Sequence, residues 1–132
     1  MNRLIVSVLL AGGLAAPALV PALAEDYASG AIKTMDSAKG EILTDANGMA
    51  LYTFDKDAAG VSSCYDDCAV KWPPAMAAAG AMASDDFTLV ARKDGSQQWA
   101  FKGKPLYLWQ GDNKPGDVSG DGMGGVWHLA KE

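Results

Sequence analysis

Apolar and polar residues alternate in short runs along most of the chain, and many of these runs stop at a glycine-bearing turn. Alternation of this kind predicts half-buried β-strands, because successive side chains of a strand point to opposite faces. Turns with glycine at 45–48 and 102–104 predict two hairpins. The expected strands are 30–35, 41–44, 49–54, 87–92, 98–101, 105–109 and 126–130.

The chain also matches itself without gaps when it is shifted by 55 positions. Tyr52 falls on Tyr107 and Trp72 falls on Trp127, which is an uncommon coincidence for such rare residues. We therefore predict a small single all-β domain, made of two pseudo-symmetric β-meander repeats that pack face to face or share a sheet. Repeat one spans about 31–74, a linker spans 75–85, and repeat two spans 86–130. Alanine and methionine in the linker predict a loose turn of helix on the surface.

The N-terminal segment 1–24 has a different character from the rest of the chain. It holds Arg3, then an apolar run interrupted by Pro17 and Pro21, and ends in the small-x-small pattern at Ala24. These are the parts of a secretory signal peptide, and the run is too short to span a membrane. We therefore expect a periplasmic or secreted protein, cleaved near Ala24, with no transmembrane segment in the mature chain.

Charge excludes one class of partner for the mature chain, 25–132. Without Arg3, ten Lys and Arg residues face 16 Asp and Glu residues, which gives a net charge of −6. Nucleic acid is excluded as a partner because phosphate binding needs a basic face. No cysteine lies in or beside the leader, so a lipid anchor is not expected there.

Both repeats carry the pattern Tyr-x-aromatic-x-x-Asp at matching places. With the segments 63–69 and 72–74, this pattern resembles a bacterial family of secreted repeats with a Y-X4-D motif, of which many members are predicted lipoproteins. The resemblance covers the mature chain and implies an architecture rather than a reaction, since the function of that family is not established. The motif positions are Tyr52, Phe54, Asp57, Tyr107, Trp109 and Asp112.

The motif residues have two interpretations that the sequence leaves open. In one, the aromatic rings fill the core of a small β-domain and each Asp accepts backbone N–H groups of the loop that follows. In the other, the rings form an exposed platform for a glycan or a partner strand, with Asp57 and Asp112 at its edge. An enzyme with these two Asp residues as acid and base is a poorer fit, because symmetric placement gives similar environments.

Cys64 and Cys68 are the two cysteines of the chain. In an exported protein, cysteines this close are expected to form a disulfide. The alternative is a copper-binding or thiol-redox site that also uses His128, the one histidine, since thiolate and imidazole are ligands that copper prefers.

A further metal candidate is the loop that begins at Asp117. Oxygen-bearing residues at Asp117, Ser119 and Asp121 match the start of a calcium loop, but His128 stands where the bidentate Glu belongs. We expect no cofactor. The function predicted from the sequence is a non-catalytic exported envelope protein that acts as a binding or structural module on a glycan or another envelope partner. The periplasmic copper or thiol-redox protein is the alternative.

Overall fold

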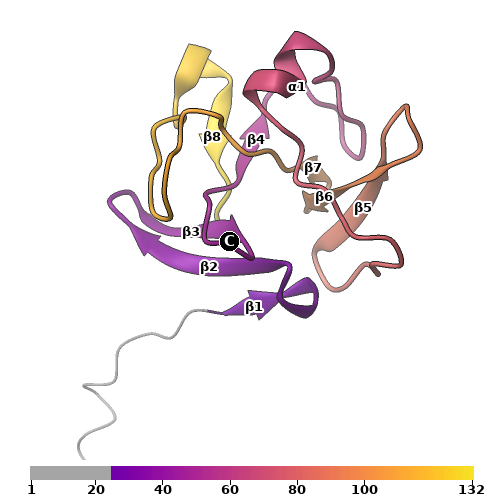
Figure 1. The fold of residues 1–132 in the computed structure, drawn as a ribbon, viewed down its shortest axis with the longest axis horizontal. Coiled ribbons are helices and arrows are strands. Elements are labelled where there is room, and N and C mark those ends of the chain that lie inside the picture. Colours follow the sequence, from indigo (N-terminus) through magenta and orange to yellow (C-terminus); the bar gives the residue numbers. More distant parts are fainter. Residues whose placement is uncertain (1–24) are drawn as a thin grey trace, which may run out of the picture.

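The computed structural model describes residues 25–132, and the expected signal peptide lies outside the described residues. The described chain is built mainly of short strands in three antiparallel sheets (Figure 1), as the all-β prediction required. The sheets have the strand orders β1-β2-β3, β4-β8 and β5-β6-β7. The elements are β1 (Asp26–Tyr27), a 3-10 turn (Ala28–Gly30), β2 (Ile32–Ser37), β3 (Gly40–Asp45), β4 (Tyr52–Phe54), α1 (Asp67–Lys71), β5 (Phe87–Ala91), β6 (Gln97–Phe101), β7 (Lys104–Pro105), a 3-10 turn (Met123–Gly125) and β8 (Trp127–Leu129).

The two repeats are joined by backbone hydrogen bonds between their motif tyrosines. Tyr52 N–H donates to the Tyr107 carbonyl at 2.8 Å, and Tyr107 N–H donates to the Tyr52 carbonyl at 2.9 Å. This reciprocal antiparallel bridge is what a twofold axis between the two residues requires. The predicted pseudo-symmetry is therefore confirmed at the centre of the molecule.

The strands next to this bridge are exchanged between the repeats. Strand β4 of repeat one pairs with β8 of repeat two, with Phe54 opposite Trp127. On the other side of the axis, Leu108 N–H donates to the Pro73 carbonyl at 2.7 Å, and Pro74 bridges to Tyr107. The segment 72–74 thus pairs with the motif strand of repeat two, as β8 pairs with the motif strand of repeat one. Its prolines lack the N–H groups of a full ladder. The repeats are interlocked rather than merely packed together.

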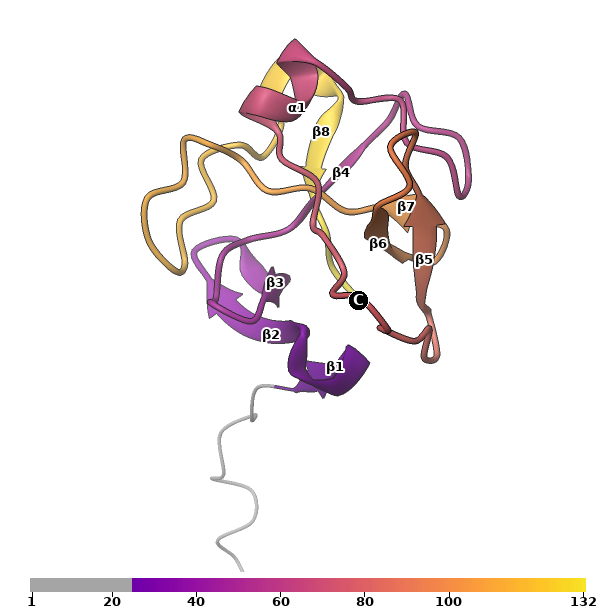
Figure 2. The ribbon, with the colours of Figure 1, turned by 45° about the vertical axis from the view of Figure 1, so that its right-hand side comes forward.

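Figure 2 shows the β4–β8 pair and α1 gathered at one end, with the other two sheets below them on opposite sides. The core has two parts, which follow from the alternation of side chains along the motif strands. Leu51 and Leu106 lie in one cluster with Phe87, Trp99 and residues around them. Tyr52 and Tyr107 point the other way, into a second, aromatic cluster.

The prediction of a helical turn in the linker is wrong. Ala75 is buried and exchanges backbone hydrogen bonds with the second hairpin: its N–H donates to Leu106, and its carbonyl accepts from Trp99. Ala77 N–H adds a bond to Gln97, so this segment runs extended beside β6 and then turns at Gly80, which has φ +83°. Pairing with a sheet edge outweighs the helix preference of a short alanine-rich segment.

The short helix α1 was not predicted from the sequence, and neither was the two-residue strand β1. The helix has five residues, Asp67–Lys71, which is too short to show a helical period. The 3-10 turn Met123–Gly125 lies at the matching place in repeat two.

Candidate functional site

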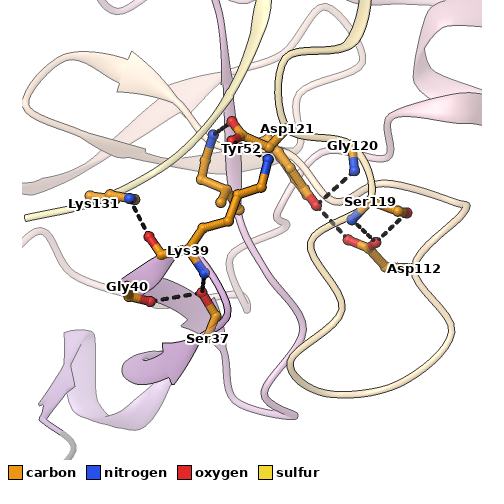
Figure 3. Close-up of polar contacts among 10 residues, drawn as sticks. Ser37, Lys39, Gly40, Tyr52, Asp112, Ser119, Gly120, Asp121 and Lys131 are labelled. Carbon is orange, nitrogen blue, oxygen red and sulfur yellow. Dashed lines mark hydrogen bonds and ion pairs between the residues drawn. The ribbon is translucent and has the colours of Figure 1, made fainter.

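The motif tyrosines and aspartates pair across the repeats, not within them. The Tyr52 hydroxyl donates to Asp112 Oδ2 at 2.7 Å (Figure 3). The Tyr107 hydroxyl donates to Asp57 Oδ2 at 2.6 Å. Each repeat thus supplies the tyrosine for the aspartate of the other, and these two bonds lie on either side of the pseudo-twofold axis.

The second oxygen of each aspartate holds the loop that follows its own motif. Asp57 Oδ1 accepts from the N–H and the hydroxyl of Ser63, both at 2.8 Å. Asp112 Oδ1 accepts from the N–H of Ser119 at 2.9 Å and from its hydroxyl at 2.7 Å. Both carboxylates are therefore engaged on both oxygens by donors of the protein.

Both tyrosines are fully buried, with no exposed side-chain surface. Burial, followed by the hydrogen bond to Asp112, raises the pKa of the Tyr52 hydroxyl far above its ordinary value. Burial and then the bond to Asp57 raise the pKa of Tyr107 in the same way. The two phenols are consequently neutral donors over the whole physiological range of pH.

Phe54 and Trp109, the other aromatic residues of the motif, are the two ends of a stack of four rings. Phe54 lies on Trp127 with ring centroids 4.1 Å apart, and Trp127 lies on Trp72 at 3.9 Å. Trp72 lies in turn on Trp109 at 4.3 Å. The two tryptophans in the middle are buried, whereas Phe54 and Trp109 are half-exposed. Of the predicted platform, only these two rings reach the surface.

Each end ring lines a surface hollow, and the repeat relates the two hollows. The first hollow, of about 240 Å³, contains Phe54 and is lined by 53–55, 57–59 and 102–105. The second, of about 200 Å³, contains Trp109 and is lined by 49–50, 108–110 and Asp112. A shift of 55 carries 53–55 onto 108–110, and 49–50 onto Lys104 and Pro105.

A buried arginine supports the first motif loop, and the sequence did not single it out. The Arg92 guanidinium donates to Ser62 Oγ at 3.0 Å, to Gln98 Oε1 at 2.8 Å and to the Cys64 carbonyl at 2.9 Å. Ser62 Oγ lies 2.6 Å from the Tyr107 hydroxyl, so the arginine joins the network of the first motif aspartate. The corresponding residue of repeat one is Ser37, so a comparison of the two repeats does not point to this arginine.

Cys64 and Cys68 form a disulfide that ties the loop before α1 to the helix itself, with Cα atoms 5.2 Å apart. His128 projects from β8 at the surface, where its Nε2 lies 2.8 Å from Asp55 Oδ2. The three residues of the copper hypothesis are thus engaged in a disulfide and a hydrogen bond, and this arrangement gives the hypothesis no support.

The residues of the calcium-like loop contact different parts of the protein. Asp117 accepts from the N–H groups of Asn113 and Lys114, and the Lys114 ammonium lowers the pKa of Asp117. Asp121 Oδ1 accepts from Leu129 N–H at 3.0 Å, and its Oδ2 accepts from the Lys39 ammonium at 3.2 Å (Figure 3). Within 25–132, no group of three or more His, Cys, Asp or Glu side chains is placed to hold a metal ion.

A comparison with protein families agrees with the repeat seen in the structure. The model of a family described as a secreted repeat of unknown function matches twice, over residues 33–76 and 88–131. The chain belongs to this family. Both matches begin and end 55 residues apart, which is the offset read from the sequence. Comparison with curated proteins and with solved structures finds no significant match.

The family places the chain among secreted proteins, which agrees with a location in the envelope or outside the cell. Among the described residues, no helix is long and apolar enough to cross a membrane.

Proposed function

We propose that this is a non-catalytic protein, exported to the periplasm or the medium after cleavage near Ala24, that acts in the cell envelope by binding a glycan. The observation that carries the proposal is the pair of hollows at the two ends of the aromatic stack. Each presents one half-exposed ring, Phe54 or Trp109, beside polar groups of its own motif segment. Rigid aromatic surface beside polar groups is typical of binding sites.

The state of the motif carboxylates supports binding over catalysis. Asp57 and Asp112 each accept hydrogen bonds on both oxygens, from a tyrosine of the other repeat and a serine of their own loop. They accept from the same kinds of donor, whereas a pair of carboxylates that share acid and base roles needs environments that separate the two pKa values. These groups hold the fold together and leave ligand binding to the rings and the hollow walls.

The proposal is tested by probing an array of cell-envelope glycans with the labelled protein. We expect retention on at least one class of glycan and its weakening in Ala59→Leu, since Ala59 is exposed at the rim of the first hollow and a larger neutral side chain there occupies the hollow. Ala38→Leu, in the exposed turn between β2 and β3, adds the same side chain elsewhere and should leave binding unchanged. Mass spectrometry of the bound glycan should show it intact. Cleavage of the glycan, or retention that neither variant alters, contradicts the proposal.

A further inference from the structure

The first hollow continues into a larger one, and together they form a groove. The adjoining hollow, of about 290 Å³, shares Thr53, Asp55, Lys102 and Lys104 with the first and extends to 128–131. One wall is the β4–β8 pair and the other is the hairpin between β6 and β7. We call this the β4–β7 groove.

Cations gather in this groove although the protein is acidic. Lys102, Lys104 and Lys131 line it, and all three are exposed. None of the ion pairs found within residues 25–132 involves any of the three. Three positive charges without a carboxylate partner, around one hollow, favour a ligand that brings negative charge.

The two carboxylates in the groove, Asp55 and Asp57, are outnumbered by the three lysines, so the groove keeps a net positive charge. Asp55 Oδ2 lies 2.8 Å from His128 Nε2. Asp57 accepts from Tyr107 on one oxygen and from Ser63 on the other. Both carboxylates are therefore engaged by donors of the protein. The Lys131 ammonium donates to the Lys39 carbonyl at 2.6 Å (Figure 3), whereas no hydrogen bond or ion pair among the described residues involves the ammonium groups of Lys102 and Lys104.

The other repeat provides a comparison within the same molecule. The residues that correspond by the repeat to the three lysines are Asn47, Met49 and Met76, which carry no charge. The repeat fold forms around neutral side chains at these places, so its packing does not call for cations at 102 and 104. These two charges are available to a ligand.

The ring of Phe54 supplies the apolar part of the groove. One face of it lies on Trp127, with ring planes 10° apart, and the ring is half-exposed where it lines the first hollow. A flat apolar surface suits the C–H face of a sugar ring, and Thr53 beside it offers a hydroxyl. An acidic peptide is less suited, because extended peptides add to a free strand edge and β7, at the wall, has two residues.

We infer that the β4–β7 groove binds an anionic, carboxylate-bearing oligosaccharide, with its carboxylates on Lys102, Lys104 and Lys131 and one sugar ring on Phe54. This rests on the proposed function and names the ligand class of the first hollow.

The test is isothermal titration of the protein with hexagalacturonate, and with the same hexamer fully methyl-esterified to remove its charges. Lys102→Glu/Lys104→Glu should weaken binding of the charged hexamer at least about tenfold, because two attractive contacts become repulsive. Lys71→Glu/Lys93→Glu changes the net charge equally at exposed residues outside the groove and should bind like the wild type. Circular dichroism checks that both variants are folded.

The esterified hexamer should bind at least about tenfold more weakly than the charged one, and added salt should weaken only the charged hexamer. Equal affinity for the two hexamers overturns the anionic class but leaves glycan binding intact. Tighter binding of an oligoglutamate peptide, or equal weakening in both lysine variants, overturns the inference as well. Failure of both hexamers while the glycan array retains the protein on neutral glycans also overturns it, without touching the proposed function.

Discussion

The exchange of motif partners between the repeats makes a sharp prediction about energetic coupling. If Tyr52 bonds to Asp112 and Tyr107 to Asp57, then the pairs that couple lie in different repeats. A double-mutant cycle with Tyr52→Phe and Asp112→Ala should show strong coupling. The cycle with Tyr52→Phe and Asp57→Ala, which joins residues of one motif, should show little.

The magnitude follows from the burial and the charge of the bond. Tyr52 is fully buried, and its hydroxyl lies 2.7 Å from a carboxylate oxygen, while Gly120 N–H donates to the same hydroxyl at 3.2 Å. A hydrogen bond to a charged group contributes about 1.5–3 kcal/mol. We expect a coupling free energy of about 1–3 kcal/mol for the pair across the repeats, and below about 0.5 kcal/mol for the pair within one motif.

The free energy of unfolding is measured for each variant by urea denaturation, with the disulfide intact and tryptophan fluorescence as the signal. Buried tryptophans stacked in one cluster should report the transition well. The pair Tyr107→Phe and Asp57→Ala repeats the test on the other side of the axis. Equal coupling within and across the motifs, or coupling only within them, would refute the exchanged arrangement.

Three other perturbations have expected outcomes. Gly120→Ala should lower the free energy of unfolding by about 1–3 kcal/mol in urea denaturation, since its Cβ would lie 2.7 Å from the ring of Trp72. Raising the pH above the ordinary tyrosine value of about 10 should lower the urea midpoint, because the raised pKa of both motif phenols means that the folded state favours their neutral form. Replacing both phenols with phenylalanine should flatten that pH dependence. Cys64→Ala/Cys68→Ala should cost about 2 kcal/mol of unfolding free energy, the loop-closure term for so short a ring, and no loss at all would show the disulfide to be dispensable for stability.

Local sequence predicted the repeat units and their hairpins well. Gly48 and Gly103 have φ of +85° and +83°, a conformation that other residues adopt at a cost, so their equal spacing was a reliable mark of two equivalent turns. Alternation in the motif strands likewise predicted that Leu51 and Tyr52 lie on opposite faces, and the two clusters of the core bear this out.

The exchange between repeats lay beyond the sequence, because identical motifs make internal and crossed partners look alike. Tyr52 could meet either aspartate, and nothing in the spacing of the motif decides which. Pro73 and Pro74 hid the second ladder, since prolines argue against a strand. A comparison of the repeats could have singled out two lysines of the β4–β7 groove, because Lys104 and Lys131 correspond to methionines in repeat one.

The β4–β7 groove as the site of glycan binding is tested most directly by nuclear magnetic resonance with the ¹⁵N-labelled protein and hexagalacturonate. Amide shifts should change at Thr53, Lys102, Lys104 and His128, which line the groove. The amide of Gln110, in the second hollow, should stay unchanged. Shifts centred on the second hollow, or no shift in either hollow at saturating hexamer, would contradict the account.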